Sequence, residues 1–83
     1  MLHVSVISPE SVLFEGESSS VVAPAFDGLV GILPRHAPFM TLLGSGTVTV
    51  RHGGEQSAFG VSGGFLQVAG DNVRIVAGAL QTG

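Results

Sequence analysis

Hydrophobic and polar residues alternate along the whole chain, and turn-forming residues interrupt the alternation every six to ten positions. In the first segment Leu2, Val4 and Val6 alternate with His3 and Ser5. Because successive side chains of a β-strand point to opposite faces, this period of two places the apolar residues on one buried face. The pattern therefore predicts strands from one end of the chain to the other and no helix.

Short runs of this kind, bounded by glycine or proline, define the predicted strands. They cover residues 2–6, 12–14, 18–24, 29–33, 39–43, 47–51, 56–61, 65–68 and 73–76. Gly16 is expected to end the second strand, and Gly53-Gly54 is a signal for a two-residue hairpin turn. So many short strands cannot form one open sheet with a bare apolar face, whereas two packed sheets or a flattened barrel would cover it. The simplest solution is an all-β fold, a flattened two-sheet β-sandwich of about ten short, mainly antiparallel strands.

The composition describes a single small domain. The chain has 83 residues, of which 45% are hydrophobic and 11% charged, and it contains no cysteine. A domain of this size buries only about 60–65% of the surface that its unfolded chain exposes, and no disulfide is available to stabilise it. We therefore expect docking to a partner to contribute to its stability.

The charge content excludes several classes of function. The chain has three arginines, no lysine and a formal net charge of -3. Nucleic-acid binders hold phosphates with clustered lysine and arginine, which are missing here. A phosphate-binding loop and a lipoyl or biotinyl carrier domain both need a lysine. No basic run precedes an apolar core, and no apolar stretch reaches about 18 residues, so neither a signal peptide nor a membrane span is expected.

One string imitates a catalytic motif. Residues 60–64 read Gly-Val-Ser-Gly-Gly, which fits the G-x-S-x-G pattern around a nucleophilic serine. That motif works where a strand turns into a helix and a histidine follows in the chain. No helix is predicted after Ser62, and His3, His36 and His52 all precede it. A glycine-rich turn is the favoured interpretation.

The remaining polar residues suggest neither a metal site nor paired acids. The three histidines have no H-x-H or H-x-x-x-H spacing, and His3 and His52 are expected to be exposed. The six acids are predicted to be solvated residues near turns: Glu10, Glu15, Glu17, Asp27, Glu55 and Asp71. No catalytic residue, cofactor or metal ligand is therefore expected.

The segment from Pro34 to Pro38 is stiff, because the two prolines fix the backbone on either side of His36. Such a segment presents its side chains rigidly, as a preorganised contact surface would. It is equally typical of an ordinary connection between strands.

Residues 28–41 carry the pattern G-x-x-G-I-x-P-x-H-A-P followed by apolar residues and threonine. This stretch resembles the amino-terminal β-sandwich of the epsilon subunit of the F-type rotary ATP synthase, called delta in mitochondria. Further matches to that family follow in the same order along the chain, at residues 2–10, 13–16, 46–48, 62–68 and 70–77. The match at 62–68 also accounts for the imitation of a nucleophile motif.

The resemblance implies a non-catalytic rotor part of the central stalk, which links the gamma subunit to the membrane ring of c subunits and couples proton flow to ATP synthesis. Its partners would be gamma and the c-ring, in a complex with alpha and beta subunits. By position, the gamma-facing residues are His36, Ala37, Pro38, Phe39 and Met40, and the ring-facing residues are Asp27, Gly28, Leu29 and Val30. The implied location is the cytoplasmic face of the bacterial plasma membrane, where the subunit would be peripheral.

The chain departs from the family pattern at two places. Many relatives have a glutamate where Leu29 stands, and Asp27 is the residue that can partly substitute for it. Family members usually continue into a carboxy-terminal helical hairpin, whereas residues 1–83 are expected to form a single epsilon-type β-sandwich domain without it. Two rival hypotheses are a free-standing β-sandwich interaction module with another partner and a small hydrolase that uses Ser62.

Overall fold

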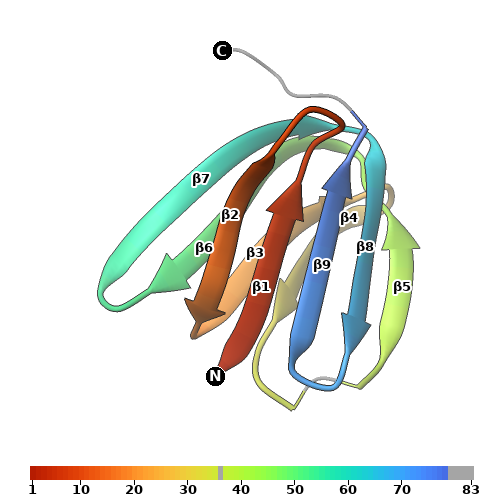
Figure 1. The fold of residues 1–83 in the computed structure, drawn as a ribbon. Coiled ribbons are helices and arrows are strands. Elements are labelled where there is room, and N and C mark those ends of the chain that lie inside the picture. The colour runs from red at the N-terminus through yellow and green to blue at the C-terminus, as the bar shows by residue number, and fades with distance from the viewer. Residues whose placement is uncertain (36, 79–83) are drawn as a thin grey trace.

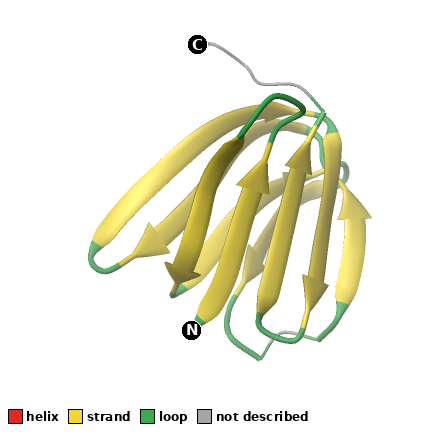
Figure 2. Ribbon diagram, in the orientation of Figure 1, coloured by secondary structure: helices red, strands yellow, loops and turns green. Residues whose placement is uncertain are grey.

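All regular elements in the described part of the chain are β-strands. The computed structural model describes residues 1–35 and 37–78, and Figure 2 shows strands joined by short loops throughout this part. The strands are β1 (Leu2–Ile7), β2 (Val12–Ser18), β3 (Ser20–Ala25), β4 (Gly28–Ile32), β5 (Phe39–Leu42), β6 (Ser45–His52), β7 (Glu55–Ser62), β8 (Gly64–Ala69) and β9 (Asn72–Ala77). The all-β prediction is confirmed, and each predicted strand has its counterpart.

The strands form two sheets that pack face to face (Figure 1). One sheet has five strands in the order β2-β1-β9-β8-β5, and the other has four in the order β4-β3-β6-β7. Strands β1 and β9 run parallel, and the other described pairs are antiparallel. The molecule is therefore the predicted flattened sandwich with mainly antiparallel pairing.

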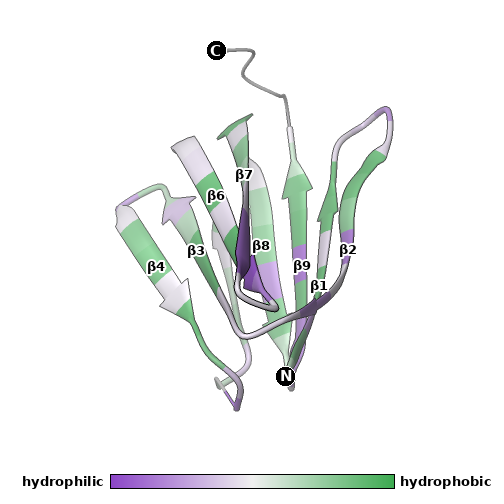
Figure 3. Ribbon diagram, turned by 90° about the vertical axis from the view of Figure 1, so that its left-hand side faces the viewer, coloured by the Kyte–Doolittle hydropathy of each residue, from purple (hydrophilic) through white to green (hydrophobic). Residues whose placement is uncertain are grey.

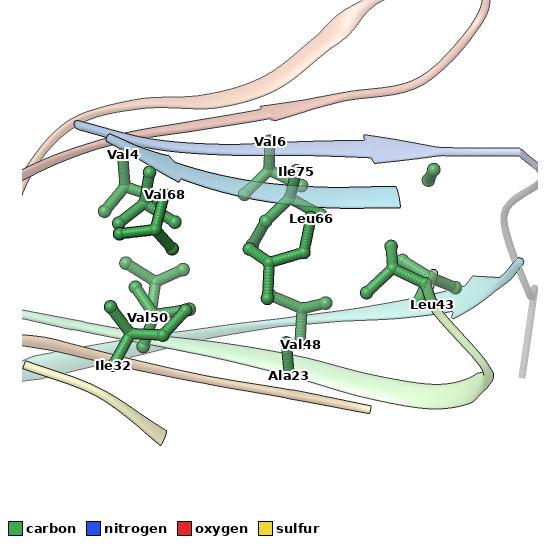
Figure 4. Close-up of a cluster of buried hydrophobic side chains, with 14 of the residues drawn as sticks. Val4, Val6, Ala23, Ile32, Leu43, Val48, Val50, Leu66, Val68 and Ile75 are labelled. Carbon is green, nitrogen blue, oxygen red and sulfur yellow. The ribbon is translucent and has the colours of Figure 1, made fainter. Parts of the chain in front are cut away.

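The core lies between the sheets and follows the alternation of the sequence. Hydrophobic and hydrophilic bands alternate along β1 and β9 (Figure 3), and every second residue of each strand is a buried hydrophobic one. Side chains of the five-stranded sheet point toward those of the four-stranded sheet (Figure 4). The hydrophobic residues with no exposed surface are Leu2, Val4, Val6, Val21, Ala23, Ile32, Val48, Val50, Val61, Leu66, Ile75 and Ala77. Branched aliphatic residues suit such a pleated, buried surface.

Strand β2 is longer than the sequence suggested. Gly16 was expected to end it, but Gly16 pairs with Val4 and the strand continues to Ser18. Gly16 has no positive φ, so it lies in an extended strand like its neighbours. A glycine ends a strand only where the chain uses its conformational freedom, which is not the case here.

One end of the sandwich is closed by backbone hydrogen bonds between the sheets. The amide of Phe26, just after β3, donates to the carbonyl of Leu42 (3.1 Å), and the amide of Gly44 donates to the carbonyl of Pro24 (2.8 Å). On the other side of β5, the amide of Leu43 donates to the carbonyl of Gly64 (2.9 Å). The β3–β4 turn is thereby tied to the end of β5.

The opposite end of the sandwich holds the β4–β5 connection, the β8–β9 turn and the start of β1 (Figure 1). Within the described residues, no helix is long and apolar enough to cross a membrane.

Candidate interaction surfaces

Strand β5 forms an edge of the five-stranded sheet and pairs with β8. Its side chains alternate, so that Phe39 packs against the core cluster while Met40 and Leu42 point outward. Met40 is 67% exposed and Leu42 is 63% exposed. The predicted gamma-facing residues therefore divide, with Met40 on the surface and Phe39 half-buried below it.

Leu42 belongs to a row of apolar side chains that crosses the whole outer face of the five-stranded sheet. Each member pairs directly with the next in the sheet register: Leu42, Phe65, Val76, Ile7 and Val12. The row spans five strands, about 19 Å at roughly 4.8 Å per strand spacing. We call these five residues the cross-strand row.

A hollow of about 370 Å³ lies at the β5 end of the cross-strand row. It is lined by Met40, Thr41, Leu42 and Phe65. Hollows of this kind accept a protruding apolar side chain of a partner, and such anchors supply much of the binding energy of an interface.

The next row of the same face is mainly polar. From β5 to β2 it consists of Met40, Gln67, Arg74, Ser5 and Glu15. An apolar strip bordered by polar side chains is the usual anatomy of a protein interface.

The predicted ring-facing residues lie in the hairpin between β3 and β4. Phe26 is 69% exposed and Leu29 is 76% exposed, and Asp27 between them is also exposed. Figure 3 shows β4 without a hydrophilic band. Val30 differs from its neighbours, because it is half-buried and packs against the core. The tip of this hairpin is thus an exposed apolar surface with one negative charge.

The connection from β4 to β5 has an unusual backbone. Arg35 has a φ of +66°, and it is the only non-glycine residue in the described part of the chain with a positive φ. Its amide donates to the Asp71 carboxylate at 2.8 Å. Ala37 and Pro38 are exposed, while His36 lies outside the described residues.

The residues considered for catalysis lie in ordinary strand, turn and surface positions. The hydroxyl of Ser62 lies 3.3 Å from that of Ser45, and the chain passes from Ser62 through Gly63 directly into β8. The turn interpretation of this motif is therefore confirmed. The six acids are exposed, as is His3.

His52 was expected to be exposed, but this prediction is wrong. Its imidazole is half-buried, with Nε2 2.9 Å from the Ser57 hydroxyl and the ring 5.0 Å from that of Phe14. His52 is therefore a packed side chain and not a freely exposed one. Among residues 1–35 and 37–78, no three histidine, aspartate or glutamate side chains gather as a metal site would require.

Comparison with known proteins identifies the family. The model of the family "ATP synthase, Delta/Epsilon chain, beta-sandwich domain" matches residues 1–83. The chain belongs to this family. Its similarity to ATP synthase epsilon chains includes 45% identity over 75 residues to that of Leptospira borgpetersenii and 45% over 76 residues to that of Caulobacter vibrioides.

The matches cover different shares of these epsilon chains. The matched region is 90% of this chain and 59% of the Leptospira protein, but 92% of this chain and 88% of the Caulobacter protein. The chain thus spans little more than half the length of the first relative and most of the second.

Solved ATP synthases contain the same fold. A chain of the Euglena gracilis mitochondrial ATP synthase (OSCP/F1/c-ring) superposes with a TM-score of 0.88 at 20% identity, covering 96% of this chain and 52% of that one. A chain of the Tetrahymena thermophila mitochondrial ATP synthase (central stalk/c-ring) superposes with a TM-score of 0.80 at 16% identity. The match covers 96% of this chain and 65% of the Tetrahymena chain. The delta/epsilon β-sandwich is therefore recognisable at low sequence identity.

Sequence reasoning missed all five residues of the cross-strand row. Met40, in the adjacent row, was named from the family motif, but Leu42, Phe65, Val76, Ile7 and Val12 were not. Each is an ordinary apolar residue of a strand, and only the sheet register brings the five together. The local signal was the apolar pair Met40 and Leu42 at alternate positions, which one strand face must share.

Proposed function

We propose that this chain is a non-catalytic rotor subunit of an F-type ATP synthase, linking the gamma subunit to the c-ring in a complex that also contains alpha and beta subunits. The observation that carries the proposal is the apolar cross-strand row on the outer face of the five-stranded sheet, which ends on β5 at Leu42, next to the exposed Met40 of the family's characteristic segment. Family membership and the assemblies in which the fold is found support it.

The gamma contact is assigned to β5 and its approach, residues 36–40, with Met40 as the central exposed anchor. Leu42 and the hollow beside Phe65 extend this contact along the cross-strand row. Met40 and Leu42 each expose more than half of a large apolar side chain. Burying such surface contributes roughly 25 cal/mol per Å², which is the main driving force of protein association.

The ring contact is assigned to the β3–β4 hairpin, with Asp27, Gly28 and Leu29 at its tip and Val30 supporting the hairpin from the core. Phe26 adds a second exposed apolar side chain beside Leu29. With Phe26 and Leu29 exposed, this contact is apolar apart from the carboxylate of Asp27.

A rotor part must transmit torque without deforming, and the architecture suits this requirement. Each strand is hydrogen-bonded into one of two sheets, and the sheets share a densely packed aliphatic core. Close-packed interiors have low compressibility and transmit strain. Backbone hydrogen bonds also join the end of β5 to the β3–β4 turn, so the two proposed contacts belong to one stiff body.

Residues 1–83 act in this proposal as one epsilon-type domain without a cofactor or an active site of their own. Its working place is the cytoplasmic face of the bacterial plasma membrane, as a peripheral part of the assembled enzyme. There it would contribute to coupling proton flow to ATP synthesis.

The proposal is tested by titrating the purified chain with the gamma subunit of the same ATP synthase and measuring complex formation by calorimetry and size-exclusion chromatography. A one-to-one complex with a Kd of about 1 μM or tighter, which corresponds to about 8 kcal/mol, is expected. Absence of a stoichiometric complex would contradict the rotor function and favour an interaction module with another partner.

A further inference from the structure

Asp71 joins three segments that are far apart in the sequence. It lies in the turn between β8 and β9, and its backbone carbonyl accepts a hydrogen bond from the amide of His3 at 2.7 Å. Its carboxylate accepts a second bond from the amide of Arg35 at 2.8 Å. The first bond holds the start of β1, and the second holds the connection that leads into β5.

The hydrogen bond between the Arg35 amide and the Asp71 carboxylate holds a residue whose backbone conformation is unfavourable. A φ of +66° lies in the left-handed region, which side chains other than glycine, asparagine and aspartate rarely occupy. Such conformations cost on the order of 1–3 kcal/mol and persist where surrounding contacts enforce them. The Asp71 carboxylate is a contact of this kind, because a hydrogen bond to a charged acceptor is stronger than one to a neutral acceptor.

The conformation of Arg35 directs the path of the chain into β5. Pro34 precedes Arg35, and Pro38 lies three residues further on, just before β5 begins at Phe39. Because proline fixes φ, the backbone of Pro34 and Pro38 is restricted, and the hydrogen bond to Asp71 restricts Arg35 as well. Met40 itself is placed by the pairing of β5 with β8, so the anchor acts on the start of the approach to β5.

We propose that Asp71 is a positioning residue for the partner-binding segment: its carboxylate fixes Arg35 in the left-handed conformation and so preorganises the approach to β5. This inference rests on the proposed gamma contact of β5. Asp71 itself does not belong to the contact, and it acts by reducing the conformational freedom that binding would otherwise remove.

The test compares Asp71→Ala with Asp71→Asn in the full chain. Asparagine keeps an oxygen that can accept the Arg35 amide proton, whereas alanine does not. Glu55→Ala is the matched control, because it removes an exposed acid that directly follows another hairpin turn. Amide hydrogen exchange at Arg35 measures how well the hydrogen bond to residue 71 protects that amide. Titration with gamma measures the effect of this bond on the Kd.

For Asp71→Ala we expect exchange at Arg35 to accelerate about tenfold and the Kd for gamma to rise by up to about tenfold, the lower end of what a hydrogen bond to a charged group contributes. Asp71→Asn should restore both quantities to within about twofold, and Glu55→Ala should change neither. Unchanged exchange in Asp71→Ala would overturn the anchor. Faster exchange with unchanged gamma binding would overturn the positioning role and leave the proposed function intact. If the unaltered chain fails to bind gamma, both proposals fall.

Discussion

The ring of Phe14 on β2 packs against the imidazole of His52 on β6, with centroids 5.0 Å apart and planes tilted by 44°. Strand β2 is an edge of the five-stranded sheet, and β6 belongs to the other sheet, so this contact crosses the sandwich at the side away from β5. Phe59 on β7 lies nearby, with its ring centroid 6.4 Å from that of Phe14. Both phenylalanines pack against the aliphatic core cluster, so aromatic rings extend the core at this side of the sandwich.

We predict that Phe14→Ala lowers the free energy of unfolding by about 2 kcal/mol. The value is below the 3–5 kcal/mol typical of fully buried phenylalanine because Phe14 is only half-buried. Phe14→Leu, which keeps most of the volume, should cost less than about 1.5 kcal/mol. Urea denaturation with an unchanged m-value measures both, and equal stability of all three proteins would show that the aromatic contact contributes nothing.

Gly64 is predicted to be the least replaceable glycine of the β7–β8 link. A side-chain carbon built there would overlap the backbone carbonyl oxygen of Val76. The neighbouring Gly63 also has a positive φ, of +74°, but has open space around it. Gly63→Ala should therefore lower the free energy of unfolding only by the conformational penalty, about 1–2 kcal/mol. Gly64→Ala should lower it by about 4 kcal/mol or more, because two paired backbones must move apart. Thermal melting would contradict this explanation if the two variants were equally stable.

The hairpin between β6 and β7 offers a conservative test of backbone conformation. Gly53 and Gly54 have φ values of +57° and +81°, as a type I′ turn requires. Asparagine tolerates this region and Asn-Gly is a preferred sequence for the turn, so Gly53→Asn should leave stability unchanged or raise it by up to about 0.5 kcal/mol. Gly53→Val should lower it by about 1–2 kcal/mol, because a β-branched residue is strained at positive φ. The denaturant midpoint should therefore stay the same or rise for Gly53→Asn and fall for Gly53→Val. An equal shift of both midpoints would refute the turn assignment.

Met40 and Phe39 should respond oppositely to a negative charge. Met40→Asp places the charge on the exposed face of β5, so the melting temperature should change little while gamma binding weakens about tenfold or more. Phe39→Asp brings a carboxylate against the core and should destabilise the domain by about 3 kcal/mol. Thr47→Asp, on an exposed position of β6 in the other sheet, is the control for charge alone. Met40→Asp that unfolds the domain, or that binds gamma as well as Thr47→Asp does, would remove Met40 from the interface.

The strands were predictable because several of them, such as β1, β6 and β9, keep an inside-outside alternation. The sequence also identified the β5 segment through a local motif. It could not separate Phe39 from Met40 by function, since both are apolar and only the packing shows which one faces the core. The cross-strand row depends on pairs such as Ile7 with Val76, which no local pattern connects.

Two further features depend on contacts between distant segments. His52 is half-buried because the sandwich brings Phe14 against it, which its place beside a hairpin turn did not indicate. Arginine has no preference for the left-handed region, so the conformation of Arg35 has no signal in the residue itself. Its partner, Asp71, is 36 positions away in the sequence.

The central claim, that the outer face of β5 lies against gamma and turns with it, is tested most directly by a cross-link in the assembled ATP synthase. The chain has no cysteine, so Met40→Cys provides a single thiol on that face, which a maleimide carrying a photoactivatable group alkylates and then joins to whatever surface lies against it on illumination. We predict that it forms a cross-link to gamma in high yield, that Thr47→Cys does not, and that the cross-linked enzyme retains most of its proton-driven ATP synthesis because the two joined parts rotate together. A Met40 cross-link to alpha or beta instead, or a gamma cross-link that stops synthesis, would contradict the account.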